Sequence, residues 1–104
     1  MRLEEMRDRL RKIQRIGYSL HFERDVMVER KITKSAIEAH LSNPDSLLAT
    51  DPQEGEKYRL VFPVSKKSAL AVVLRFIGEQ EIRIITAHPI ALKRLRRYRL
   101  WLQK

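Results

Sequence analysis

The stretch ALAVVLRFI-GEQ-EIRIITA, residues 69–87, decides the fold of this chain of 104 residues. Residues 69–77 are almost continuously apolar and rich in β-branched side chains, which is typical of a central strand covered on both faces. Residues 78–80 are a short polar connection, and residues 81–87 are again strand-like. The sequence therefore predicts an antiparallel hairpin that turns at residues 78–80.

The predicted hairpin places Arg75 directly opposite Arg83. The same register gives two apolar pairs, Phe76 with Ile82 and Leu74 with Ile84. Two like charges directly across a strand pair are unfavourable unless an anion binds there, and a local conflict of this kind often marks a functional site. The alternative is that both arginines project into solvent, while the diagonal Glu81 neutralises one of them.

Further strands are expected before the hairpin. Residues 58–63 alternate between the two faces of a strand, with Pro63 near its end or on a sheet edge. Residues 46–49 are a candidate first strand, residues 51–55 a polar loop, and residues 65–68 a basic turn.

The N-terminal segment predicts a helix over residues 2–16. Its apolar residues recur at helical spacing, at Leu3, Met6, Leu10 and Ile13. Gly17 is expected to end the helix. The apolar stripe packs either on the sheet or on a second copy of the chain, which would make the protein a homodimer.

Three other helices complete the expected fold. A short helix at residues 22–30 precedes a second helix, which Thr33 or Ser35 caps and which stops at residues 43–45. Pro89 suits the first turn of a final basic helix. We therefore predict a single α+β domain over residues 1–104. It has a small antiparallel sheet of three to four strands, an additional N-terminal helix within residues 1–16, a short helical pair and a C-terminal basic helix.

The composition excludes several classes of protein. Hydrophobic residues make up 43% and charged residues 34% of the chain, which is neither a disordered nor a membrane-embedded composition. The longest apolar run, residues 69–74, is too short to cross a bilayer. No signal peptide is recognisable, so we expect a cytoplasmic protein. The absence of cysteine removes disulfides, cysteine-ligated zinc, iron–sulfur clusters and thiol nucleophiles.

The net charge of +9 is concentrated at the two ends of the chain. Residues 1–16 hold six Lys or Arg against three acids, residues 17–88 hold ten of each, and residues 89–104 hold six Lys or Arg and no acid. This pattern suits a polyanion such as RNA or DNA, or an acidic protein partner. The alternative is that the basic helices only keep a small protein soluble.

Several short motifs carry a resemblance to a known family. They are His21-Phe followed by Glu29-Arg30-x-Ile32-Thr33, then Asn43-Pro44-Asp45, the strand IRIITA at residues 82–87, and the basic, Tyr-bearing stretch at residues 93–98. Residues 18–99 with these motifs resemble the RelE/ParE-like toxin superfamily, nearest to its BrnT-like branch. The helix at residues 2–16 lies outside the usual plan of that branch, and His88 stands where BrnT-like chains tend to carry an arginine.

The resemblance implies an endoribonuclease toxin, free or ribosome-associated, that a cognate antitoxin neutralises. Its implied partners are RNA, including ribosome-bound mRNA, and an acidic antitoxin protein. Some superfamily members poison DNA gyrase instead, and fold does not settle function.

Metal-free RNA cleavage needs a base for the 2′-hydroxyl proton, cations for the charge on the phosphate, and a donor for the leaving oxygen. Arg75 and Arg83 are the candidate phosphate ligands, because guanidinium groups bind phosphate through paired donors. His88 is the candidate base or acid, since the dipole of the predicted final helix would disfavour its imidazolium form. The alternative is that His88 only fills an N-cap position.

Tyr98 is the fourth candidate catalytic residue. The C-terminal Tyr of the family suggests that it donates a proton or stacks on a base. Its position on the apolar side of the predicted helix equally fits a core tyrosine.

The remaining polar residues suggest binding rather than chemistry. The basic residues of the final helix are expected to contact the nucleic-acid backbone: Lys93, Arg94, Arg96 and Arg97. Asp25 and Glu29 lie one helical turn apart, but with no third ligand nearby in sequence a solvated helix face is the simpler interpretation. His21 and His40 are interpreted as structural. We expect no metal and no cofactor.

Three functions fit these observations. The first is a toxin-type, metal-independent endoribonuclease of a toxin–antitoxin system. The second is a non-catalytic RNA- or DNA-binding module that uses the same basic surface. The third is an assembly protein whose basic helices dock an acidic partner chain.

Overall fold

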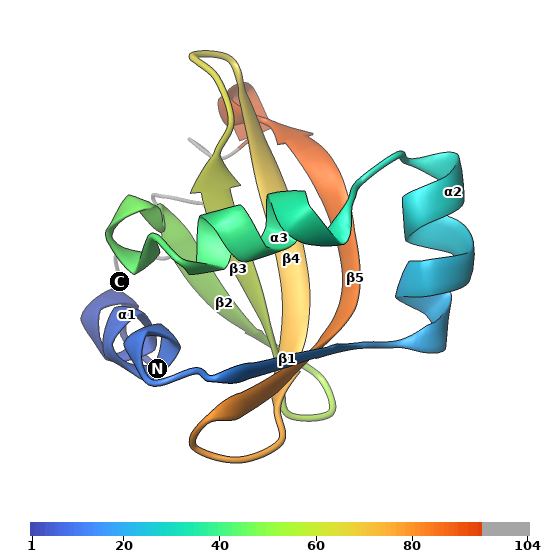
Figure 1. Ribbon diagram of the computed structural model, residues 1–104. Coiled ribbons are helices and arrows are strands. Elements are labelled where there is room, and N and C mark those ends of the chain that lie inside the picture. Colours follow the sequence, from blue (N-terminus) through green and yellow to red (C-terminus); the bar gives the residue numbers. More distant parts are fainter. Residues whose placement is uncertain (95–104) are drawn as a thin grey trace.

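The computed structural model describes residues 1–94 and shows an α+β fold, in which helices cover one face of a five-stranded sheet (Figure 1). The helical elements are α1 (Leu3–Arg11), a π-helical turn η1 (Phe22–Val26) that continues into α2 (Met27–Glu29), α3 (Lys34–Leu41) and a 3-10 turn η2 (Pro44–Ser46). The strands are β1 (Arg15–Tyr18), β2 (Ala49–Gln53), β3 (Lys57–Pro63), β4 (Ser68–Phe76) and β5 (Glu81–Ala91). The predicted fold class is confirmed, with one strand more than expected. No helix within residues 1–94 is both long and apolar enough to cross a membrane.

The strands follow the order β1-β5-β4-β3-β2, and only β1 runs parallel to its neighbour. Sequence analysis missed β1, because the predicted helix extended to residue 16. The helix ends at Arg11, and the backbone N–H groups of Gln14 and Arg15 donate to the carbonyl of Gln80 at 2.7 and 3.0 Å. Gly17 therefore lies within β1, not at the end of a helix.

The predicted register of the β4–β5 hairpin is confirmed. Arg75 pairs with Arg83 across the two strands. The apolar pairs are Phe76 with Ile82 and Leu74 with Ile84. Beyond Leu74 the register shifts, so that Thr86 lies opposite Val73 and His88 lies opposite Ala71. The extra residue is Ile85, a β-bulge.

The predicted start of the final helix at Pro89 is wrong, because β5 continues to Ala91. β1 pairs with β5 only as far as Ile84, so within residues 1–94 no further strand covers the outer edge of β5. A proline is tolerated on such an edge because its missing N–H breaks no ladder bond. Residues 92–94 are helical, and the rest of the predicted helix lies outside the described residues.

The predicted first strand is also displaced. The structure has a 3-10 turn at Pro44–Ser46 and places β2 at Ala49–Gln53, which includes part of the predicted polar loop. β2 is the edge strand of the sheet, where Pro52 is tolerated. Asp51 of β2 accepts a hydrogen bond from Arg59 of β3 at 2.8 Å, which ties this edge to the sheet.

The helices pack on one face of the sheet around the larger of two buried apolar clusters. Figure 1 shows α3 crossing in front of β3 and β4, with α1 and α2 beyond the two ends of β1. Thr33 caps α3 by accepting from the N–H of Ala36, as one of the two predicted caps. The buried residues of this core are Met6, Leu10, Phe22, Val26, Ile37, Leu41, Leu47, Leu60, Phe62, Leu70, Val72, Leu74, Ile82, Ile84 and Ala87.

The apolar stripe of α1 belongs to this core within a single chain. Met6 is fully buried and Leu10 is 4% exposed. The stripe therefore packs on the sheet, and pairing of two chains through α1 stays a prediction.

Truncating this stripe should destabilise the fold. We expect Leu10→Ala to lower the free energy of unfolding by about 2–5 kcal/mol, because it leaves a cavity beneath α1. The exposed Glu5 of the same helix provides the control, and Glu5→Ala should stay within about 0.5 kcal/mol of the parent chain. Urea unfolding measures both values. An unchanged midpoint for Leu10→Ala would show that α1 does not pack on the sheet.

Candidate nucleic-acid interface

Side-chain alternation gathers cations on the sheet face turned away from the helices. Lys57 of β3 pairs with Arg75 of β4, which pairs with Arg83 of β5. Adjacent strands lie about 4.8 Å apart, so the backbones of these three residues fall within about 10 Å. We call the side of the sheet that carries Lys57, Arg59, Arg75, Arg83 and His88 the basic face.

The two arginines are not neutralised by the residue that sequence analysis considered. Nε of Arg15 donates to the carboxylate of Glu81 at 3.2 Å, and this is the ion pair that Glu81 makes. Arg75 donates from Nη2 to the carbonyl of Gly55 at 2.9 Å. Both Arg75 and Arg83 are exposed, and neither forms an ion pair within residues 1–94. An anion bound across them would relieve the repulsion between the two charges.

Arg59 occupies the next row of the same face. Its guanidinium donates to Asp51, which is 6% exposed and also accepts from the side-chain amide of Gln53. Much of the Arg59 charge therefore serves to hold β2 against β3. The charge of Arg59 also acts across β4 on His88 of β5, where it contributes to lowering the pKa of the imidazole.

His88 lies within β5, so the helix N-terminus expected around it is wrong. The bulge at Ile85 decides its orientation, because an unbroken register would pair His88 with Leu70 and point it toward the helices. With the bulge it pairs with Ala71, on the face that carries Arg75 and Arg83. Burial, followed by the charges of Arg30 and Arg59, lowers the pKa of His88. The imidazole is therefore neutral at pH 7 and can accept a proton.

The other predicted site residues lie apart from these or outside the described part of the chain. Lys93 and Arg94 are exposed just after β5, whereas Arg96, Arg97 and Tyr98 lie outside the described residues. Within residues 1–94, no group of three or more His, Cys, Asp or Glu side chains could hold a metal ion. Asp25 instead contacts His21, at 2.9 Å between Oδ2 and Nδ1.

Sequence analysis missed Arg30 as part of this region. Its guanidinium donates to the carbonyl of Ala87 at 2.7 Å, directly before His88. Arg30 and Ala87 are 57 positions apart in the sequence. No local sequence pattern predicts this contact, because it depends on how η1 packs against β5 and places the residue that follows α2.

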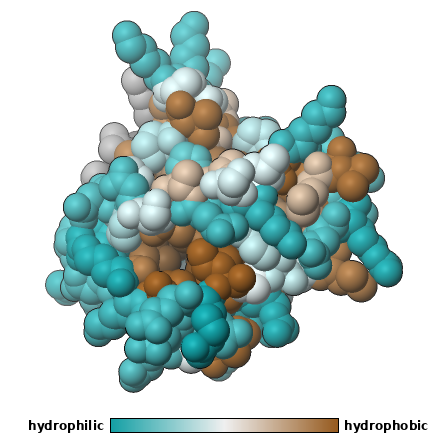
Figure 2. All heavy atoms as spheres, in the orientation of Figure 1, coloured by the Kyte–Doolittle hydropathy of each residue, from teal (hydrophilic) through white to brown (hydrophobic). Residues whose placement is uncertain are grey.

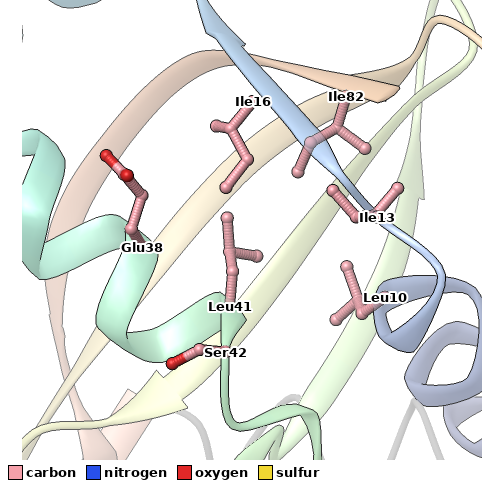
Figure 3. Close-up of a pocket in the computed structure, with 7 residues that line it drawn as sticks. All are labelled: Leu10, Ile13, Ile16, Glu38, Leu41, Ser42 and Ile82. Carbon is pink, nitrogen blue, oxygen red and sulfur yellow. The ribbon is translucent and has the colours of Figure 1, made fainter. Parts of the chain in front are cut away.

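A pocket on the helix side of the sheet is a poor candidate for a polyanion. It has a volume of about 240 Å³ and lies between α1, β1 and α3 (Figure 3). Its lining residues are Leu10, Ile13, Ile16, Leu41 and Ile82, with Glu38 and Ser42. Figure 2 shows hydrophobic side chains in a hollow between α3 and β1. The lining contains no cation, and Glu38 would repel phosphate.

Comparison with known proteins identifies a shared fold. No protein-family model matches the sequence, and no curated protein matches it either. BrnT, a ribonuclease toxin of Brucella abortus, has a similar structure, with a TM-score of 0.58 at 10% sequence identity. The similarity covers 74% of this chain and 96% of the BrnT chain. At so low an identity it shows that the two chains share a fold, as the BrnT-like resemblance implied, and says nothing of individual residues.

The environment of His88 predicts a change in stability with pH. The pKa of His88 is lowered in the folded chain, whereas the unfolded chain has the ordinary value of 6.5. As the pH falls through 6.5, the unfolded state takes up this proton more readily, so stability is lost on the acid side. His88→Gln should therefore lose less stability between pH 8 and pH 5 than the parent chain. Thermal unfolding at both pH values measures the difference, and an identical pH dependence would contradict the assigned environment.

Proposed function

We propose that this protein is a toxin-type, metal-independent endoribonuclease whose basic face binds the RNA backbone. The observation that carries the proposal is the row formed by Lys57, Arg75 and Arg83, which places like charges side by side with no ion pair within residues 1–94. Phosphate is the ligand that such a row suits, because paired guanidinium donors match its oxygens. The fold shared with the ribonuclease toxin BrnT agrees with the same function.

In the proposed reaction, a neutral His88 takes the proton of a ribose 2′-hydroxyl. The 2′ oxygen attacks the adjacent phosphorus, the bond from phosphorus to the 5′ oxygen breaks, and a donor protonates the leaving oxygen. The products are a 2′,3′-cyclic phosphate and a free 5′-hydroxyl. Arg75 and Arg83 stabilise the charge on the phosphate, and Tyr98 is the donor that sequence analysis nominated.

The biological setting is part of the same proposal. Membership of the RelE/ParE-like superfamily would make this chain the toxin of a toxin–antitoxin pair, acting in the cytoplasm on RNA that includes ribosome-bound mRNA. An acidic antitoxin would complement the net charge of +9. A homodimer is compatible with this setting but is not required by it.

A non-catalytic RNA- or DNA-binding module is the second candidate. The exposure of Arg75 and Arg83 favours it as much as it favours an enzyme, because both can grip a backbone without any proton transfer. Lys93, Arg94, Arg96 and Arg97 would extend the contact beyond β5. The two candidates differ in what His88 does.

Cleavage of RNA in EDTA by the purified chain separates them. For an enzyme, Arg75→Ala and Arg83→Ala should each lower the cleavage rate by about 10²-fold or more, because each removes charge directed at the phosphate. His88→Ala should cost about 10²–10⁴-fold and leave the binding isotherm nearly unchanged. Lys66 is exposed in the turn before β4, so Lys66→Ala is the control for loss of one charge.

The opposite pattern identifies a binder: the arginine variants weaken RNA binding, His88→Ala has no effect, and no RNA is cleaved. Cleavage that disappears in EDTA would contradict the metal-independent mechanism. The same assay with and without ribosomes shows whether the substrate is free or ribosome-bound RNA.

The basic residues after β5 predict a change in salt dependence. Replacing Lys93, Arg96 and Arg97 together with Gln should weaken RNA binding and flatten the plot of log K against log salt by about 0.7 units per lost contact to single-stranded RNA. Sequence preference should hardly change, since such residues contact the backbone. If RNA and DNA affinities both survive the triple change, this segment serves only solubility.

A further inference from the structure

A chain of polar contacts lies at the outer edge of β5, beyond the end of β1. From Thr86 onward, no strand within residues 1–94 pairs with that edge. The helical segment formed by η1 and α2 lies beside it instead (Figure 1). The two ends of this segment bring His21 and Arg30 to the strand.

Four side chains are joined in sequence by these contacts. Nη1 of Arg30 lies 3.3 Å from Oγ1 of Thr86, and Oγ1 of Thr86 lies 3.4 Å from Nε2 of His21. Nδ1 of His21 lies 2.9 Å from a carboxylate oxygen of Asp25. An ionised carboxylate can only accept, so Nδ1 carries a proton in both the neutral and the imidazolium form, and Nε2 is the nitrogen that faces Thr86. The contact with Asp25 therefore fixes which atom of the imidazole is presented.

The cluster opens onto the basic face. Thr86 pairs with Val73 and His88 with Ala71, so Thr86 and His88 lie on the same face, two residues apart along β5. That separation is about 7 Å. Arg30 bonds to the carbonyl of the intervening Ala87, and its positive charge contributes to the lowered pKa of His88. Arg30 thus contacts Thr86, which His21 also contacts, and Ala87, which directly precedes His88.

Structural stabilisation does not explain this arrangement. The side chain of His21 is 50% exposed and that of Asp25 is 53% exposed. An exposed pair one helical turn apart adds only a few tenths of a kcal/mol to stability. Because half of the His21 side chain is exposed, a ligand can reach the imidazole. The adjacent η1 is a π-helical turn, and such turns occur frequently at functional sites.

We infer that His21 is the proton donor to the leaving 5′ oxygen, that Asp25 positions it, and that Arg30 and Thr86 bind the scissile phosphate beside it. This inference rests on the proposed endoribonuclease function and replaces Tyr98 as the donor. His88 takes the 2′-hydroxyl proton, the 2′ oxygen bonds to phosphorus, and the bond to the 5′ oxygen breaks. His21 acts in its imidazolium form, which carries a proton on each nitrogen, and gives the Nε2 proton to the leaving 5′ oxygen. Arg30 adds a third guanidinium to the pair formed by Arg75 and Arg83.

A substrate with an activated leaving group tests the role of His21. Uridine 3′-(4-nitrophenyl phosphate) releases nitrophenolate, which leaves without a proton, so a general acid is dispensable for it. We expect His21→Ala to lower kcat for RNA by about 10²–10⁴-fold with little change in KM, and to cleave the nitrophenyl ester within about tenfold of the parent rate. His88→Ala should be impaired on both substrates, because the base is needed in each.

Two further variants separate chemistry from folding. Asp25→Asn should show the same selective loss on RNA as His21→Ala, but a smaller one, since it positions the donor. Arg30→Ala should lose about 10²-fold on both substrates. Arg24 is an exposed arginine of the same helical segment, so Arg24→Ala should match the parent chain. Thermal unfolding of each variant confirms that the fold is retained.

The outcomes are distinct. Parent-like cleavage of RNA by His21→Ala, or equal losses on RNA and on the nitrophenyl ester, would overturn the role of His21 while leaving the proposed function intact. Absence of cleavage of both substrates by the parent chain would overturn the proposed function, and the role of His21 with it.

Discussion

The register of the β4–β5 hairpin determines which side chains of this sheet face the helices and which face away from them. The turn at residues 78–80 places Leu74 opposite Ile84 and Phe76 opposite Ile82, and these apolar pairs pack toward the helices. The intervening position must then project to the other face, and there it brings Arg75 against Arg83. A slip of one residue would bury two guanidinium groups without partners, which would cost far more than any single apolar contact could return. The same constraint therefore fixes the core and exposes the basic face.

The bulge at Ile85 and the early end of β1 modify this plan at one end of β5. The bulge reverses the alternation, so that Thr86 and His88 join the basic face. The short β1 leaves the edge of β5 to the segment formed by η1 and α2, and Arg30, which directly follows α2, donates to the carbonyl of Ala87. Within residues 1–94, the imidazoles of His21 and His88 and the guanidinium of Arg30 therefore lie along the part of β5 that β1 does not pair with. The apolar pocket on the helix side has none of these groups, and the two sides of the sheet differ accordingly.

The sequence predicts well the features that depend on nearby residues. The hairpin, its register and the pairing of Arg75 with Arg83 are contained in one stretch of 19 residues whose turn and apolar pattern agree, and α3 carries its own cap at Thr33. β1 was missed because its partner lies 66 positions away and its residues also continue a helical stripe. His88 was misplaced because Pro89 fits both a helix start and an edge strand. The contacts among His21, Arg30 and Thr86 could not be predicted, since they require the bulge and the packing of η1 against β5.

The central claim is that the basic face, and not the helix side, contacts RNA. Chemical-shift mapping with an RNA in which every 2′-hydroxyl is methylated, so that it cannot be cleaved, tests this most directly. The account predicts that the largest shifts fall on β3, β4 and β5 around Arg75, Arg83 and His88, and continue to Arg30. Shifts concentrated on α1 and α3, around the pocket that Leu10 and Leu41 line, would contradict it.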